Sequence, residues 1–418
     1  MNQFKKMYYS STPLRVASFF MSPRSYKSSN FKVLIEDLFP TPYEEKERDV
    51  HLCKVMSWLY HAYSQGKPGV AGSYYMNLGW TGPYPETTGY IIPTFLNYST
   101  YVQQHGMQKE VNTNKYTTAA MDMANWLVDI QLENGGFPAG TLETDSREPN
   151  VFNTGQIIIG LVTAFEYTQD KTYLNAAERA GDWLVSVQNT NGTWTKFTYE
   201  HDARSYHSRI SWPLLLLHAT LPKESYRTAA RKNLDWIVTN QLANSWFKKA
   251  NFYDEKTTLM HTLAYTLRGL LETGILLNET RYINAVKDTA YKLLRIYEIR
   301  KYDLLPALFD ETWKATVDYS CLTGCAQMSI IWSKLFNIKG DIRFFNAALK
   351  INTALKKNQS LHIKSQDMHG GIKGSYPIQG AYMPFSFPNW AAKFFVDALL
   401  LEQTILEKLT KEMTGDSL

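Results

Sequence analysis

Three segments of the chain repeat one pattern: KYTTAAMDMANWLVDIQ (115–131), KTYLNAAERAGDWLVSVQ (171–188) and ESYRTAARKNLDWIVTNQ (224–241). The tryptophans of successive copies are 57 and 53 residues apart. Within each copy, tyrosine, paired alanines and tryptophan recur at intervals of three, four and seven, which is the spacing of one face of an amphipathic helix. The pattern predicts a helix in each copy and a helical repeat along the chain.

Weaker copies extend the repeat toward both ends of the chain, at 48–65, 280–298 and 341–359. Six further segments lie between the copies, and they carry fewer charges. Because apolar residues cover more of their circumference, we expect them to be the more buried member of each pair. The sequence thus predicts twelve helices in six pairs. The six further segments are 88–102, 153–168, 209–221, 261–277, 319–336 and 388–406.

The connections carry a repeat of their own. Glutamine is followed four residues later by a small residue and then by an apolar one, in copies that begin at Gln131, Gln188, Gln241 and Gln366. Glycine supplies the left-handed cap that ends a helix, and a glutamine amide can hydrogen-bond backbone groups at the turn. We expect a structural role for this motif. Similar glycine-rich strings mark the first and last connections, as expected if the pairs close into a ring.

The glutamine motif and the alternating helix pairs resemble the α/α-toroid superfamily. It includes terpenoid cyclases, prenyltransferase β-subunits, six-hairpin glycosidases, sugar epimerases and polysaccharide lyases. The resemblance covers about residues 46–405 and implies an all-α (α/α)6 toroid of six helical hairpins, with an inner and an outer ring of helices. It also implies a ligand cleft at the end where the inner helices start. We expect residues 1–45 to form an irregular N-terminal segment and residues 406–418 a polar C-terminal tail.

Composition narrows the classes of function. The chain has 418 residues, 44% of them hydrophobic and 14% aromatic, which is typical of an ordered globular protein. The net charge of +5 is small and dispersed, which argues against nucleic acid as a partner. The most basic stretch, 21–32, is interpreted as a solvated arm. Three cysteines and the lack of a long apolar run favour a cytoplasmic protein without a membrane span.

The sequence lacks the motifs of several classes of enzyme. The Asp-rich strings of terpenoid cyclases do not occur, nor do a P-loop, a GxGxxG turn or a GxSxG nucleophile elbow. Cys321 and Cys325 are one helical turn apart, but no histidine or second cysteine pair accompanies them at metal-binding spacing. We interpret them as small buried residues and expect no metal and no cofactor.

Polar and aromatic residues gather at the expected starts of the inner helices. Six helix N-termini that point into one cleft create a positive field, which favours a carboxylate-bearing ligand. Toroid enzymes that epimerise or cleave uronates use such residues for proton transfer and for the sugar carboxylate. The resemblance implies proton transfer by His207, His261, Tyr265 and Tyr319, and carboxylate binding by Arg209, Asn153 and Gln156. Glu86 is the best single acid for a catalytic role. From their positions at the expected cleft, we predict further substrate contacts by Trp80, Tyr84, Tyr90, Trp313, Asn389 and Trp390.

The sequence predicts a carbohydrate-active enzyme of bacterial surface-polysaccharide metabolism. We expect it to act on a uronate-containing oligo- or polysaccharide by proton abstraction, as an epimerase or a lyase. A glycoside hydrolase is the alternative, and it requires a pair of carboxyl groups. Glu86 could pair with Asp145, Asp202, Asp310 or Glu311 in that role. A toroid that binds a glycan or a protein without catalysis is the third hypothesis, and convergence of the polar residues in one pocket would favour an enzyme over it.

Overall fold

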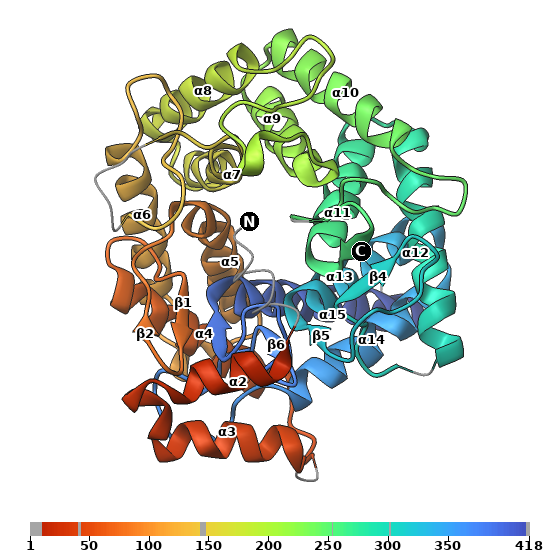
Figure 1. Ribbon diagram of the computed structural model, residues 1–418. Helices are drawn as coiled ribbons and strands as arrows, with labels where there is room; N and C mark the ends of the chain where they lie inside the picture. The colour runs from red at the N-terminus through yellow and green to blue at the C-terminus, as the bar shows by residue number, and fades with distance from the viewer. Residues whose placement is uncertain (1–10, 41–42, 143–147, 253, 301, 415–418) are drawn as a thin grey trace.

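The computed structural model describes residues 11–40, 43–142, 148–252, 254–300 and 302–414, and the helices within them form a closed ring (Figure 1). The predicted twelve helices are present among these residues, and the predicted (α/α)6 toroid is confirmed. The inner ring consists of α5 (Pro85–Gln104), α7 (Val151–Thr168), α9 (Ser208–Thr220), α11 (Met260–Leu276), α13 (Leu322–Lys339) and α15 (Asn389–Thr414). The outer ring consists of α4 (Arg48–Gly66), α6 (Asn114–Asp129), α8 (Lys171–Ser186), α10 (Glu224–Thr239), α12 (Thr280–Arg300) and α14 (Ile342–Lys357).

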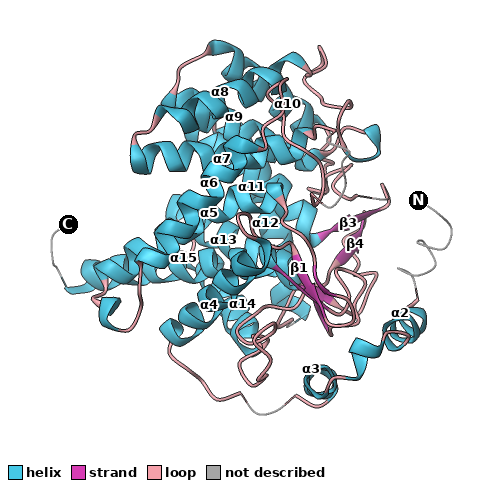
Figure 2. Cartoon of the chain, turned by 90° about the vertical axis from the view of Figure 1, so that its left-hand side faces the viewer, coloured by secondary structure: helices cyan, strands magenta, loops and turns pink. Residues whose placement is uncertain are grey.

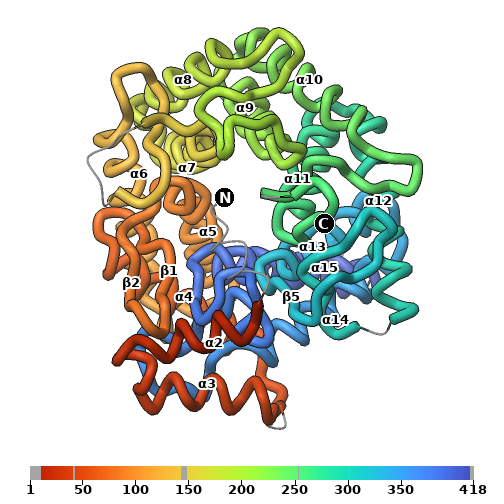
Figure 3. Tube along the Cα trace, in the orientation of Figure 1, coloured from red at the N-terminus to blue at the C-terminus, as the bar shows by residue number. Residues whose placement is uncertain are grey.

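Inner helices contact one another in chain order, and α15 closes the ring by packing against both α5 and α4. The tube view shows this closure, with the last helix beside the first ones (Figure 3). The inner helices are the more buried set, as predicted. In α11, for example, the side chains from Met260 to Leu267 are all buried. Inner helices approach closely where they carry glycine: a Cβ on Gly160 of α7 would overlap the carbonyl oxygen of Gly89 in α5.

The repeated glutamines join neighbouring outer helices. Gln131 Nε2 donates to the carbonyl oxygen of Ala176 in α8 (2.8 Å), and Gln188 and Gln241 make the same bond to α10 and α12. Each amide therefore satisfies a backbone acceptor of the next repeat, which explains why the motif recurs at the period of the hairpins.

The prediction for the last copy of the glutamine motif, which begins at Gln366, is wrong. Gln359, at the end of α14, makes the bond that the motif predicts: its Nε2 donates to the carbonyl oxygens of His51 in α4 (3.1 Å) and Gly370 (2.9 Å). Gln366 has the expected spacing to Gly370, but it lies on the connecting loop. The connection here is longer than in the other copies, so spacing alone chose the wrong residue.

Loops with short strands cover the end of the ring at which the inner helices begin (Figure 2). These strands are an addition to the predicted all-α architecture. One antiparallel sheet has the order β2-β1-β7, and two strand pairs accompany it, β3 with β4 and β5 with β6. Their bounds are β1 (Ser73–Tyr75), β2 (Gly79–Trp80), β3 (Thr257–Leu259), β4 (Leu308–Asp310), β5 (Ser320–Cys321), β6 (Ser375–Tyr376) and β7 (Ser386–Pro388).

Both end segments are helical where the structure describes them. The N-terminal segment is helical rather than irregular: α2 (Thr12–Phe20) and α3 (Ser28–Leu38) are joined by a short 3-10 turn, η1 (Pro23–Tyr26). Phe19 of α2 stacks on Phe385 (4.2 Å between ring centroids), which anchors the segment to the loops at the mouth of the ring. The expected polar tail is also helical as far as Thr414, because α15 continues beyond the ring.

Candidate active site

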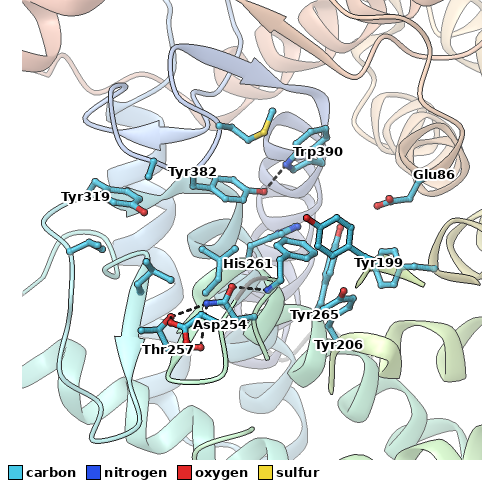
Figure 4. Close-up of a pocket in the computed structure, with 18 of the residues that line it drawn as sticks. Glu86, Tyr199, Tyr206, Asp254, Thr257, His261, Tyr265, Tyr319, Tyr382 and Trp390 are labelled. Atoms are coloured by element: carbon cyan, nitrogen blue, oxygen red, sulfur yellow. Dashed lines mark hydrogen bonds between the residues drawn. The ribbon is translucent and has the colours of Figure 1, made fainter. Parts of the chain in front are cut away.

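A cavity of about 1400 Å³ opens at the end of the ring where the inner helices begin (Figure 4). Sites for drug-sized ligands are smaller, ~300–1,000 Å³, so this cavity has room for several sugar rings. First-turn residues of four inner helices line it: Glu86 of α5, Asn153 of α7, His261 of α11 and Trp390 of α15. Side chains at a helix start point back toward the N-terminus, which directs them to this end of the ring.

Glu86 is a buried acid in the cavity wall. Tyr84 donates a hydrogen bond from its hydroxyl to Glu86 Oε2 (2.6 Å). Burial raises the pKa of Glu86 to about 7, although the Tyr84 hydrogen bond and the charge of Arg209 act in the opposite direction. Near neutral pH the carboxyl group is therefore present in both protonation states, as a group that accepts and donates protons requires.

An aromatic wall faces Glu86 across the cavity (Figure 4). Trp390 Nε1 donates to the hydroxyl of Tyr382 (2.8 Å). Tyr265 also lines the cavity, and its ring centroid is 4.3 Å from that of His261. Burial, reinforced by the charge of nearby Glu86, raises the pKa of the Tyr265 hydroxyl, so it remains a proton donor.

The two predicted histidines line the cavity, and both are neutral. Burial, helped by the positive charge of Arg209, lowers the pKa of His261 to about 3. Gln327 Nε2 is 2.9 Å from His261 Nδ1, so this amide fixes the orientation of the imidazole ring. The other ring nitrogen, His261 Nε2, is then the atom that can exchange a proton with a ligand. Burial and Arg204 likewise lower the pKa of His207 to about 3. The Nδ1 of His207 accepts a bond from the backbone N–H of Arg204 (3.4 Å).

Arg209 and Gln156 lie behind the cavity wall rather than in it, contrary to their predicted contact with a substrate carboxylate. They bind each other: Arg209 donates from Nε (3.1 Å) and Nη2 (2.8 Å) to Gln156 Oε1. The guanidinium lies 5.1 Å from the Tyr265 ring centroid and 4.8 Å from that of Trp212. The positive charge of Arg209 therefore lowers the pKa of Glu86 from behind the cavity wall.

Three more residues that were predicted to contact the substrate do not line the cavity, because their side chains pack elsewhere. Trp80 Nε1 donates to Asp367 Oδ1 (2.9 Å), and Trp313 Nε1 donates to the carbonyl oxygen of Asn244 (2.9 Å). Asn389 binds the carbonyl oxygen of Ala71 (2.9 Å). The remaining predicted site residues do line the cavity: Glu86, His207, His261, Tyr265, Tyr319, Tyr84, Tyr90, Asn153 and Trp390.

The cavity also contains residues that the sequence did not single out. Tyr382 comes from a loop without periodicity, and Arg15 comes from α2, in the segment expected to be irregular. Arg15 Nε donates to the carbonyl oxygen of Gln379 (2.8 Å), which holds α2 over the rim. The third residue is Tyr199, from the segment before α9. The aromatic and charged string YEHDARSYH, just before an inner helix, could have identified it. Tyr206, which the sequence places at the expected start of that helix, also lines the cavity.

The acids proposed as partners of Glu86 do not converge on it. Asp202 forms ion pairs with Arg204 (3.3 Å) and Lys249 (3.1 Å), outside the cavity lining. Asp310 caps a turn by accepting from Thr312, and the neighbouring Glu311 is exposed. Asp145 lies outside the described residues.

Two other acids line the cavity near its mouth. Asp254 accepts from the backbone N–H of Lys256 (2.7 Å) and from Thr257 Oγ1 (2.8 Å), and Asp318 is exposed. Within the described parts of the chain, no group of three or more His, Cys, Asp and Glu side chains is placed to hold a metal ion. Cys321 and Cys325 are both fully buried.

No protein-family model and no curated protein sequence matches the chain. Its fold matches solved structures of carbohydrate-acting enzymes. An unsaturated glucuronyl hydrolase specific for heparin has a TM-score of 0.65 at 14% identity, covering 86% of this chain and 98% of that chain. The unsaturated glucuronyl hydrolase of Bacillus sp. GL1, responsible for glycosaminoglycan degradation, has a TM-score of 0.65 at 13% identity, covering 85% and 96%.

The cellobiose 2-epimerase of Bacillus thermoamylovorans has a TM-score of 0.63 at 12% identity, covering 90% of this chain and 100% of that chain. These proteins are α/α toroids of the six-hairpin glycosidase superfamily, so the predicted fold resemblance is confirmed. At such identities the likeness concerns the fold. Among the described helices, none is both long and apolar enough to cross a membrane.

Proposed function

We propose that the chain is a carbohydrate-active enzyme that acts on a uronate-containing glycan by proton transfer, as an epimerase or a lyase does. The observation that carries the proposal is the position of Glu86. A buried carboxyl group with a pKa of about 7 faces neutral proton donors across a cavity with room for several sugar rings. The solved structures reported above with a similar fold are of enzymes that act on sugars, which makes a glycan the expected ligand of this cavity.

The proposed reaction begins at the carbon next to the sugar carboxylate. Ionised Glu86 removes the C5 proton, and the electron pair passes into the carboxylate. In epimerisation, a hydroxyl of the opposite wall, such as that of Tyr265 or Tyr382, returns a proton to the other face of C5. In elimination, the electron pair instead forms the C4–C5 double bond and expels the C4 oxygen, which takes a proton from the same wall. A base and an acid on opposite sides of the ring serve both reactions.

Removal of the C5 proton places a second negative charge on the carboxylate, and the site has positive groups to stabilise it. Arg15 and Lys256 line the rim of the cavity. The inner helices add the positive ends of their dipoles. Arg209 lies beneath Tyr265, where its charge acts through a buried and weakly screening environment. We therefore expect a preference for acidic over neutral saccharides.

Hydrolysis is less well supported, because it needs two carboxyl groups on either side of one bond. Of the acids that line the cavity among the described residues, Glu86 alone is buried. Asp254 is held by hydrogen bonds within its own turn, and Asp318 is exposed to solvent.

The direct test is incubation with uronate-containing oligosaccharides in deuterated water. Exchange of the H5 signal without chain cleavage indicates an epimerase, and an unsaturated product indicates a lyase. Release of reducing ends from saturated substrates, without either signal, would replace the proposal with hydrolysis. Absence of turnover on a broad uronate panel, with measurable binding, would favour a non-catalytic toroid. Glu311→Gln is a control for the loss of an acid outside the cavity.

Replacing His261 with glutamine should lower kcat by about 100-fold and leave KM nearly unchanged, because a neutral imidazole in the wall assists proton transfer more than binding. Steady-state kinetics on the purified variant measure both constants. His218→Gln is the matched control, since His218 binds a backbone carbonyl oxygen at the far end of α9. An unchanged kcat in the His261 variant would assign this residue to packing alone.

Replacing Arg15 with glutamine should raise KM for an acidic substrate by about tenfold, the effect of one lost charge-assisted contact. The control is Arg24→Gln, which removes a charge from the same N-terminal segment but outside the cavity lining. Isothermal titration with charged and neutral oligosaccharides separates the two roles. Equal weakening for both ligands would show that Arg15 only holds α2 in place.

A further inference from the structure

The helix α3 buries two polar side chains beside the apolar Val33, and it exposes a row of apolar side chains. Its inward face carries Asn30 and Asp37: Asn30 Nδ2 donates to the carbonyl oxygen of Met76 (2.9 Å), and Asp37 Oδ2 accepts from the backbone N–H of Ile378 (2.6 Å). Its outward face carries Phe31, Ile35 and Leu38, at the i, i+4, i+7 spacing of one helical face, and all three are exposed. A helix that merely covers a core has the opposite arrangement.

The exposed apolar surface continues beyond α3. Leu38 is 66% exposed, Phe39 is 73% exposed and Met21, which follows α2, is 84% exposed. Between the two helices, the rings of Phe20, Tyr26 and Phe31 form a cluster with centroids 5.9 to 6.4 Å apart. We call the exposed residues the apolar face: Met21, Tyr26, Phe31, Ile35, Leu38 and Phe39. Scattered single residues need no explanation, but a contiguous patch marks a binding surface.

Basic residues outnumber acidic ones in the same segment. The described residues 11–40 contain four Lys or Arg and two Asp or Glu, which is a net charge of +2. Arg24 and Lys27 are exposed, and Lys32 lies beside the apolar face, where its ammonium is 4.0 Å from Glu36 and donates to the carbonyl oxygen of His362 (2.6 Å). Of the two acids, Asp37 is neutralised by its ion pair with Lys373, and Glu36 is only partly exposed.

We propose that the apolar face is a docking site for the surface of an anionic phospholipid bilayer. Exposed apolar and aromatic side chains that enter the headgroup region, combined with basic residues that attract anionic lipids, are the two components of interfacial membrane binding. Anchoring of α3 through its buried polar side chains presents the face as a rigid surface. Figure 2 shows α2 and α3 toward the end of the ring that carries the strands.

Co-sedimentation of the full chain with vesicles tests the proposal. We expect binding to phosphatidylcholine vesicles that contain phosphatidylglycerol, little binding to phosphatidylcholine alone, and release at high salt because exposed charges are screened. The double substitution Leu38→Ser and Phe39→Ser should abolish binding. Lys27→Glu should weaken it about fivefold or more, the effect of a basic residue near an anionic surface.

Two matched controls should bind as the unaltered protein does. Ile299→Ser removes an apolar side chain that is 65% exposed on α12, and Lys109→Glu reverses an exposed charge outside the N-terminal segment. Equal sedimentation of every variant, or binding that does not depend on anionic lipid, would overturn the proposal. Light scattering provides the other decisive result. If the unaltered protein is a dimer and the Leu38 and Phe39 variant a monomer, a second copy of the chain covers this face, and the membrane proposal is wrong.

Discussion

Replacing Glu86 with glutamine is expected to lower the turnover rate by at least two orders of magnitude and, at the same time, to stabilise the protein above neutral pH. Loss of a general base typically lowers the rate by about 10²–10⁴-fold. Glutamine has the size of the protonated side chain and can still accept the hydrogen bond from Tyr84, so the cavity should keep its shape. The catalytic loss is measured by proton exchange at C5.

The gain in stability follows from the raised pKa of Glu86. The pKa is about 7 in the folded protein and 4.5 in the reference state of an unfolded chain, so the protonated form is favoured by folding. This contribution is fully present below pH 4.5 and is lost as the pH rises through 7. Each pH unit between the two values corresponds to about 1.4 kcal/mol, so ionisation of Glu86 costs the folded state about 3 kcal/mol.

Urea unfolding at pH 5 and pH 8 measures this difference. The unaltered protein should lose stability between the two pH values relative to the glutamine variant. Glu311→Gln should reproduce neither the loss of activity nor the gain at pH 8, because Glu311 is exposed. A glutamine variant with full activity would remove Glu86 from the mechanism, and one with no stability gain would show that the folded protein does not resist its ionisation.

Replacing Arg209 with methionine should destabilise the protein and shift its pH–rate profile upward. The substitution leaves Gln156 Oε1 without its donor, and an unsatisfied buried acceptor costs about 1–3 kcal/mol. Arg209 also lowers the pKa of Glu86, so its loss should raise that pKa further. If the pKa rises by about one unit, the ionised fraction of Glu86 well below the new midpoint falls about tenfold, and the rate with it.

The variant Gln156→Met separates the two effects. It removes the hydrogen-bond acceptor but keeps the charge of Arg209, so it should destabilise the protein without raising the midpoint of the pH–rate profile. Unfolding curves measure the loss of stability in both variants, and pH–rate profiles measure the shift of the midpoint. Equal midpoints in the two variants would mean that the charge of Arg209 does not reach Glu86.

The architecture could be predicted from the sequence because helical periodicity is a local signal. The repeated Trp126, Trp183 and Trp236 define outer helices, and the apolar segments between them define inner ones. The error at Gln366 shows the limit of this approach: a motif read by spacing alone fails where the connection has a different length, and Gln359 makes the bond instead.

The cavity was predicted less completely, because it depends on contacts between distant parts of the chain. Residues in the first turn of a helix, such as Glu86 and His261, were located correctly since the helix itself directs them. Aromatic residues outside the helices, such as Trp80 and Trp313, carry no such signal and pack against other elements. Tyr382 and Arg15 were missed for the same reason: each is brought to the cavity by a loop or helix whose position the local sequence does not specify.

The pairing of α4 with α15 has a consequence for the order in which the protein can assemble during synthesis. Most helices pack against neighbours made shortly before or after them, so hairpins can form while the chain is still being translated. The contacts that close the circle are different, since Thr94 and Asp397 are 303 positions apart and Arg48 and Glu402 are 354 apart. Until α15 emerges from the ribosome, the sides of α4 and α5 that it covers remain open to water, so the nascent chain is exposed to aggregation while the residues between α5 and α15 are translated.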